Sequence, residues 1–440
     1  MFGTPEETPA SVPATATQAG LTDRWWWVET TVWTERMRAA LENGVKGGMW
    51  FSLMDKVYSL ANLQAAWTRV QANEGAAGID RQTISMFAEN AEWELRQLHE
   101  QLRKGSYRPQ PGLRAWIDKL GSTEKRPLGI PAIRDRVVQT ALRHVLEPIW
   151  EAEFAETSYG FRPGRGCKDA LRRVDALLKQ GFTWVVDADL RKYFDTIPHD
   201  PLMEVVRQRI ADGRVLDLIE SYLQAGIMDG FEFQESEQGT PQGAVISPLL
   251  ANLYLNDVDH EAARQGFEMI RYADDFVILC RTREAAEGAL AWVRERMEAK
   301  GLTLHPDKTR LVDATQKGGF DFLGYHFERG MHWPRKKSLD KLRERIREKT
   351  PRNSGHSLVR IISSVNATLQ GWFGFFKHSY KTTFGPIDSW VRMRLRSILR
   401  KRAGRKGRGR GADHQRYPNK FFAEQGLFNL SKAHALAASP

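Results

Sequence analysis

Two acidic segments of the sequence carry residue types that could hold divalent metal ions. The segment VVDADLRKYFD places Asp189 after an apolar run, and RYADDFVIL places Asp274 and Asp275 before another. If both runs are strands, their ends could bring the three carboxylates together. Two Mg²⁺ ions about 4 Å apart can activate a 3′-hydroxyl and stabilise a leaving pyrophosphate, and Mg²⁺ prefers oxygen ligands. The pattern therefore predicts two-metal phosphoryl transfer.

Two other aspartates remain alternatives from the residues alone. Asp187 shares a strand face with Asp189, because positions two apart in a strand point the same way. Asp195 follows six residues after Asp189. A lone Asp-Asp pair is more often a solvated turn, and only its place between apolar runs, with a second acidic strand end upstream, favours a metal site.

The elements that must position these acids alternate between strands and helices. Short apolar runs predict strands at 182–186, 275–280 and 320–325, and helical periodicity falls at 134–154, 201–225, 248–263 and 283–300. Strands separated by long helices indicate an α+β or α/β layer. Residues 338–402 are helical in pattern, and 404–411 form a Gly/Arg-rich linker.

Charge is distributed unevenly along the 440 residues. Residues 331–440 hold 25 Lys and Arg against 6 Asp and Glu, whereas the first 330 hold 40 against 48. A clustered positive charge indicates a polyanionic partner, because Lys and Arg neutralise phosphates and release counterions. We therefore expect nucleic acid to bind the C-terminal quarter.

Several classes of protein are disfavoured by composition. The two cysteines, Cys167 and Cys280, form neither a disulfide framework nor a zinc motif, which suits a reducing, cytoplasmic setting. Residues 1–20 lack the basic lead and apolar run of a signal peptide or membrane span, and we expect a disordered leader and no membrane partner.

An ordered series of motifs resembles bacterial group II intron reverse transcriptases, also called maturases. The resemblance runs from about residue 41 to 402 through these blocks: NEGAAGID, KRPLGIPAIRDRVVQTAL, SYGFRPGRGCKDAL, WVVDADLRKYFDTIPHD, QGTPQGAVISPLLANLYLNDVD, RYADDFVIL, GLTLHPDKTRL and FDFLGYHF. It implies an α+β right-hand polymerase whose fingers and palm (61–330) have an antiparallel sheet core. An N-terminal extension (21–60) precedes them, and an all-helical thumb or maturase domain (331–402) and a basic tail (403–440) follow.

The resemblance also assigns roles within the catalytic region. Asp189, Asp274, Asp275 and the backbone of Leu190 would hold two Mg²⁺ ions. Residues expected to contact the nucleotide are Lys125, Arg126, Phe194, Gln242 and Lys308. Phe194 would exclude a 2′-hydroxyl, and QGTPQG suits a tight loop near a ligand. The alternatives are a core phenylalanine, an ordinary turn and surface charges.

Basic residues of two regions are expected to contact RNA. They are Arg162 and Arg165 of the YGFRPGR loop, for which a structural role is the alternative, and Lys377, Arg392, Arg396 and Arg400 of the helical end. Arginines beside aromatics suit phosphate contact and base stacking. The short C-terminal end resembles the class C proteins, which lack an HNH nuclease.

The function implied is an RNA-dependent DNA polymerase that binds its group II intron RNA, assists splicing and copies RNA into DNA during retromobility. Its partners would be intron RNA, an RNA template with a DNA or RNA primer, dNTPs and target DNA, in the bacterial cytoplasm. One alternative is an RNA-binding splicing maturase with little polymerase activity. An RNA-dependent RNA polymerase is a weaker third reading.

Overall fold

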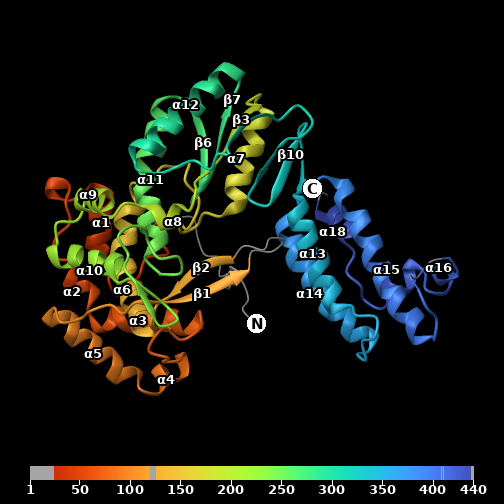
Figure 1. Cartoon of the computed structure of the whole chain (residues 1–440), viewed down its shortest axis with the longest axis horizontal. Coiled ribbons are helices and arrows are strands. Elements are labelled where there is room, and N and C mark those ends of the chain that lie inside the picture. The colour runs from red at the N-terminus through yellow and green to blue at the C-terminus, as the bar shows by residue number, and fades with distance from the viewer. Residues whose placement is uncertain (1–23, 119–124, 408, 410, 438–440) are drawn as a thin grey trace.

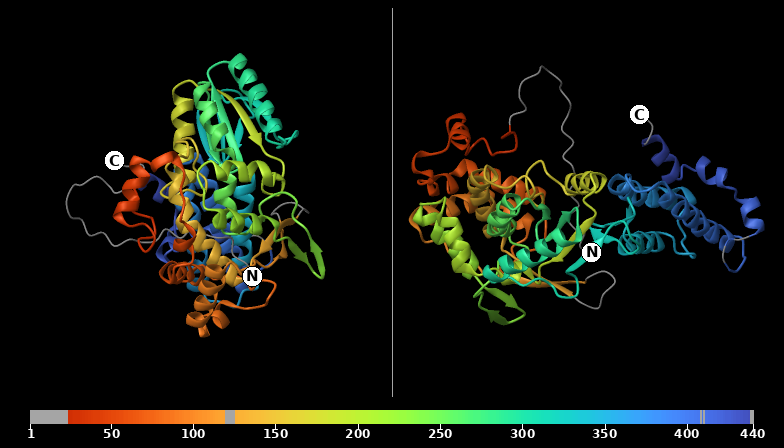
Figure 2. Two further views of the ribbon diagram at one scale, coloured as in Figure 1. Left: turned by 90° about the vertical axis from the view of Figure 1, so that its left-hand side faces the viewer. Right: turned by 90° about the horizontal axis from the view of Figure 1, so that it is seen from above.

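The fold is described by a computed structural model, which covers residues 24–118, 125–407, 409 and 411–437. The leader expected at 1–20 lies outside the described residues. A large lobe holds the N-terminal helices and the first sheets, and a helical C-terminal lobe lies beside it (Figure 1). Seen from above, the C-terminal helices extend away from the large lobe (Figure 2).

Helices form most of the N-terminal part of the large lobe. They are α1 (Glu35–Asn43), the short 3₁₀ helix η1 (Lys46–Gly48), α2 (Met54–Val57), α3 (Leu60–Ala72), α4 (Ile84–Glu89), α5 (Ala91–Lys104) and α6 (Ile133–Glu151). Helix α6 is buried on nearly every side, with α2, α3 and α5 packed against it. The N-terminal extension joins this core, since the Trp33 indole Nε1 donates to the His144 carbonyl at 2.8 Å.

The fingers also contain a four-stranded sheet of order β2-β1-β4-β5. Its strands are β1 (Gly112–Asp118), β2 (Lys125–Ile130), β4 (Ile227–Asp229) and β5 (Glu232–Gln234). Strand β1 pairs antiparallel with β2 and parallel with β4. The KRPLGIP motif thus forms β2, which pairs with β1, and β4 and β5 are strands that the apolar pattern did not indicate.

The palm is an antiparallel sheet of order β6-β7-β3-β8. Its strands are β3 (Trp184–Asp189), β6 (Glu268–Tyr272), β7 (Asp275–Cys280) and β8 (Arg310–Asp313). One face packs on α11 (Ser247–Arg264) and α12 (Arg283–Ala299), and the other on α7 (Cys167–Lys179). The short helix α8 (Tyr193–Thr196) follows β3, and the helical segment expected at 201–225 is two helices, α9 (His199–Arg207) and α10 (Gly213–Gln224).

A third antiparallel sheet, of order β11-β10-β9, joins the palm to the C-terminal lobe. It consists of β9 (Phe320–Phe322), β10 (Tyr325–Glu328) and β11 (Met331–Pro334). The single strand expected at 320–325 is divided, because Leu323 and Gly324 both have positive φ angles, 45° and 87°, and reverse the chain. Phe320, Phe322 and Phe327 extend the palm core that α7 covers.

The C-terminal lobe is helical, as expected, and continues beyond residue 402. Its elements are α13 (Lys336–Lys349), α14 (Leu358–Phe376), η2 (Lys381–Thr383), α15 (Phe384–Arg402), α16 (Ala412–Arg416), α17 (Asn419–Glu424) and α18 (Leu430–Ala437). The expected tail is folded, because Phe422 and Leu430 are buried against α14 and α15. No helix within the described residues is long and apolar enough to cross a membrane.

Candidate active site of the palm

The central strands of the palm bring the predicted acids to one end of the sheet. Asp189, the last residue of β3, lies directly opposite Asp275, the first residue of β7. Asp274 occupies the turn before β7, where Ala273 has a left-handed φ of 59°. Side chains of directly opposed residues share a face and lie close together. The register thus unites two of the three predicted acids and leaves the third on the adjoining turn.

Burial and mutual repulsion govern the protonation of these acids. The pKa of Asp275 rises from 3.8 to about 7, chiefly by burial and then through the negative charges of Asp274, Asp187 and Asp189. Burial also raises the pKa of Asp274, with Asp189 adding to the rise and Arg126 and Lys308 opposing it. A divalent cation would relieve this repulsion, since opposite charge favours the ionised carboxylate.

In this structure the predicted acids lie near one another without forming a complete metal site. Within the described residues, no group of three or more His, Cys, Asp or Glu side chains is arranged so that it could hold a metal ion. The Lys308 ammonium contacts Asp189 Oδ2, so a cation already stands beside that carboxylate. Leu190 bridges to Leu304 next to this acid, and the Asp189 carbonyl accepts from the His305 amide at 2.7 Å. These contacts fix the backbone from which Asp189 and the Leu190 carbonyl would reach an ion.

The two alternative aspartates are engaged elsewhere. Asp187 lies one pair deeper on the same sheet face and accepts from Arg310 Nε at 3.0 Å. Asp195 accepts from Gln242 Nε2 at 3.4 Å. The positive charge of Arg310 thus offsets the negative charge of Asp187, and Asp195 lines a cavity.

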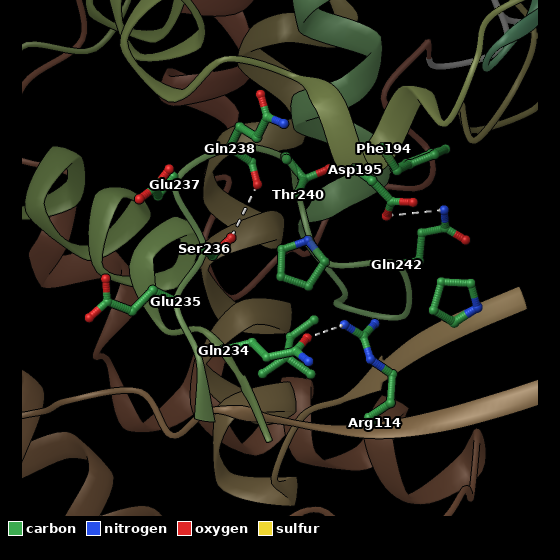
Figure 3. Close-up of a pocket in the computed structure, with 14 residues that line it drawn as sticks. Arg114, Phe194, Asp195, Gln234, Glu235, Ser236, Glu237, Gln238, Thr240 and Gln242 are labelled. Atoms are coloured by element: carbon green, nitrogen blue, oxygen red, sulfur yellow. Dashed lines mark hydrogen bonds between the residues drawn. The ribbon is translucent and has the colours of Figure 1, made fainter. Parts of the chain in front are cut away.

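That cavity, of about 390 Å³, separates the palm from the fingers sheet (Figure 3). Phe194 and Asp195 form one wall, the loop from Gln234 to Gln242 a second, and Arg114 and Pro127 of the fingers a third. The Thr240 amide donates to the Phe194 carbonyl at 2.6 Å, and the Gly129 amide to that of Gln242 at 2.7 Å. Phe194 and Gln242, which were expected to contact the nucleotide, therefore lie together between palm and fingers.

Glycine is required where this loop crosses α8. Gly239 has φ of 87°, and a Cβ there would lie 2.8 Å from backbone atoms of Phe194 and Asp195. Sequence patterns did not indicate Arg114, whose guanidinium donates to Gln234 Oε1 at 3.2 Å across the cavity. Arg114 belongs to β1, which lies outside the recognised motifs. Its position beside the cavity therefore depends on the pairing of β1 within the fingers sheet.

The predicted cations of the fingers and palm approach the acids from two directions. Lys125 and Arg126 are exposed on β2. Burial raises the pKa of Asp274 and Asp195, and the positive charge of Arg126 opposes the rise at both. Lys308 is exposed beside Asp189. Exposed cations around a carboxylate cluster suit a polyphosphate that bridges to bound metal.

The two arginines of the YGFRPGR loop bind groups within the protein. Arg162 is buried, with Nε 3.0 Å from Glu151 Oε2 and Nη1 donating to the carbonyls of Ala155 and Ser158. Its donors are satisfied inside the protein, contrary to the expected contact with RNA. Arg165 pairs with Glu156 and is partly exposed.

The four predicted cations of the helical lobe differ in accessibility. Arg396 is 2% exposed and donates to the Tyr417 carbonyl and Asn419 Oδ1, both at 2.8 Å. This buried arginine anchors the start of α17. The expected contact of Arg396 with RNA is therefore not supported, because its side chain is not accessible. Arg400 pairs with buried Asp413 at 2.6 Å. Lys377 and Arg392 are partly exposed, at the end of α14 and on α15.

Two family matches cover the palm and the helical lobe. Residues 117–327 match the family described as reverse transcriptase (RNA-dependent DNA polymerase). Residues 339–417 match the group II intron maturase-specific domain, which extends past the expected boundary at 402. The two matches follow the order that the motifs predict.

Curated proteins with similar sequences include one bacterial protein of comparable extent. Protein YkfC of Escherichia coli (strain K12) is 37% identical, over 57% of this chain and 76% of that protein. Group II intron-encoded protein LtrA of Lactococcus lactis subsp. cremoris is 37% identical, over 44% of this chain and 32% of LtrA. The chain thus matches about a third of LtrA.

Solved structures resemble the chain more distantly. A partial Cas6-RT-Cas1–Cas2 complex is 26% identical with a TM-score of 0.37, over 56% of this chain and 42% of that one. Apo telomerase from Candida tropicalis is 13% identical with a TM-score of 0.43, over 84% and 77%.

Proposed function

The chain belongs to the reverse transcriptase family and carries a group II intron maturase domain, and from this membership we propose how its residues act. It is an RNA-directed DNA polymerase that binds intron RNA and a template. We propose that it copies RNA into DNA from dNTPs with two Mg²⁺ ions, assists splicing of its intron, and engages target DNA during retromobility. A bacterial cytoplasmic setting suits this role.

The observation that supports the proposal best is the strand register, which sets Asp189 opposite Asp275 with Asp274 on the adjoining turn. Enzymes of this family use divalent metal ions. When bound, two Mg²⁺ ions would activate the primer 3′-hydroxyl and offset charge on the leaving pyrophosphate. The three aspartates, with the Leu190 carbonyl, are the residues proposed to hold them.

The remaining residues orient the nucleotide. Phe194 lines the cavity, where its ring would exclude a ribose 2′-hydroxyl, and the Gln242 amide would offer a donor to the nucleotide. Arg126 and Lys125 would bind the triphosphate from the fingers, and Lys308 would place an ammonium near the leaving group. Each acts by position and charge, because the preorganised dipoles and cations stabilise developing charge.

Primer extension on an RNA template with dNTPs tests the polymerase assignment. We expect Asp274→Asn to lower DNA synthesis by at least about 100-fold, as loss of a group that stabilises the transition state does. Intron RNA binding should stay within about 2-fold of wild type, because the basic surface is in another lobe. Asp217→Asn, an exposed aspartate on α10, is the matched control.

The alternative is a splicing maturase with little polymerase activity, which the separate maturase match supports. A folded wild-type protein that binds intron RNA yet makes no DNA would favour it. Extension with rNTPs in preference to dNTPs would instead indicate an RNA-dependent RNA polymerase. Loss of RNA binding along with synthesis in Asp274→Asn would contradict separate sites for the two activities.

A further inference from the structure

A fully buried ion pair stands directly behind the catalytic turn. Arg271, near the end of β6, and Asp259, on α11, each have 0% exposed side chains. Arg271 Nε donates to Asp259 Oδ1 at 2.8 Å, and Arg271 Nη2 donates to Asp259 Oδ2 at 2.5 Å. A guanidinium paired bidentately has a fixed orientation. The pair therefore locks the Arg271 side chain against α11.

The other side of the guanidinium holds the turn itself. Arg271 Nη1 donates to the Ala273 carbonyl and to Asn252 Oδ1, both at 3.0 Å. Ala273 has φ of 59°, a region that residues other than glycine rarely adopt. The peptide whose carbonyl Arg271 binds is the one that leads directly into Asp274. Arg271 thus restrains the peptide that aims the metal-binding pair.

The start of the YGFRPGR loop and the residues just before it also contact Arg271 and Asn252. The Arg271 amide donates to the Thr157 carbonyl at 3.0 Å, and the Tyr159 amide to the Arg271 carbonyl at 2.9 Å. Asn252 Nδ2 donates to the Gly160 carbonyl at 2.6 Å. A Cβ on Gly160 would lie 2.5 Å from the Ala273 nitrogen. The loop, α11 and the turn are therefore in close contact, with no room for a side chain at residue 160.

We propose that Arg271, held by Asp259 and Asn252, is a positioning residue that sets the affinity of the palm for divalent metal by fixing the Ala273–Asp274 peptide. Its side chain is buried between β6 and α11 and would act only through the turn. The inference rests on the proposed metal role of Asp274 and Asp275. It predicts that disturbing Arg271 weakens metal binding and leaves nucleotide binding unchanged.

Arg271→Lys tests this role because it keeps the positive charge and removes the planar fork. Mn²⁺ binding is measured by electron paramagnetic resonance on the full chain with template, dideoxy-terminated primer and matching dNTP. We expect the Mn²⁺ Kd to rise about 10-fold or more, as it does for outer-shell partners of metal ligands. In separate extension assays kcat should fall, while the dNTP KM stays within about 2-fold.

Arg296→Lys provides the control. Arg296, on α12, pairs with Glu261 at 2.9 Å, and Glu261 lies two residues from Asp259 on the same helix. It tethers α11 away from the turn, so its Mn²⁺ Kd should match wild type. A lower melting temperature in Arg271→Lys with wild-type Mn²⁺ Kd and kcat would reduce Arg271 to a structural role and overturn the proposal.

Asn252→Ala carries the test if Arg271→Lys fails to fold. It leaves the Arg271–Asp259 pair intact and removes one acceptor together with the bond to Gly160. The Mn²⁺ Kd should rise in the same direction, and a wild-type value in this folded variant would also overturn the proposal. If the wild type binds Mn²⁺ but extends no primer, the polymerase proposal fails, whereas the positioning role still stands or falls on the Mn²⁺ shift.

Discussion

Burial of individual carboxylates in the palm disfavours their ionised forms, and a bound metal ion can offset this effect. Asp275 pairs across the strands with Asp189, and Asp274 adjoins it on the turn. Burial disfavours their charged forms, and each negative charge raises the pKa of its neighbours. Without metal, Asp275 is therefore partly protonated near neutral pH, and a bound cation would displace that proton.

This proton predicts a pH-dependent metal affinity. Asp275 has a pKa of about 7 in the folded protein against 3.8 ordinarily, so the folded state binds the proton more tightly. Stability of the metal-free protein should therefore fall as pH rises from about 4 to 7, and change little from this group above 7. Mg²⁺ binding should release about one proton at pH 6 and almost none from this group at pH 8.5.

Calorimetric Mg²⁺ titration in buffers of different ionisation enthalpy measures the released proton. The apparent affinity should fall by up to about 10-fold per pH unit below 7, as expected when one proton competes with the metal. An affinity that is constant from pH 6 to 8.5 would contradict the displaced proton.

Phe194 makes a second prediction at the scale of one residue. Phe194→Ala should raise kcat/KM for rNTPs relative to dNTPs by about 10- to 100-fold, because the removed ring would no longer exclude the 2′-hydroxyl. The ratio is read from single-nucleotide extension on one template. Phe233→Ala, an exposed aromatic of the fingers hairpin, is the control. An unchanged ratio in a folded Phe194→Ala would argue for a packing role alone.

Among the helices and strands, those whose own residues carry a clear apolar periodicity were predicted best. The strand expected at 275–280 and the helix expected at 283–300 agree with β7 and α12, apart from one terminal residue of the helix, because each has its own apolar periodicity. Strands β4 and β5 were missed, since each is three residues long, and β4 depends on pairing with β1 and β5 on pairing with β4. Arg162 and Arg396 were placed in contact with RNA because charge alone gives no sign of a buried partner.

The packing of the YGFRPGR loop against the catalytic turn predicts an effect of one methyl group. Gly160→Ala should lower stability by about 1–3 kcal/mol and reduce DNA synthesis, because its Cβ would lie 2.5 Å from the Ala273 nitrogen. Thermal unfolding and primer extension measure the two losses. Gly166→Ala is the matched control, since its Cβ would meet only Asp169 Oδ2, at 4.0 Å. Equal behaviour of the two variants would refute the close contact.

Across the whole molecule, the two lobes carry opposite charge. The first 330 residues hold more acids than bases, and residues 331–440 carry a large basic excess. Lys377 and Arg392 are partly exposed in the basic lobe, whereas Arg396 and Arg400 are engaged within it. We therefore expect intron RNA to bind mainly the basic lobe, because the palm carboxylates would repel phosphate without metal.

This segregation predicts a salt dependence that separates the two activities. Intron RNA affinity should fall steeply with salt, and Lys377→Ala and Arg392→Ala should each reduce the slope of log K against log salt by about 1. Filter binding across a range of KCl concentrations measures the slope. Arg283→Ala on α12, which removes a palm arginine paired with Glu287, should leave it unchanged. Wild-type slopes in both lobe variants would show that RNA contacts other cations, while a loss of slope in Arg283→Ala would place RNA on the palm helices.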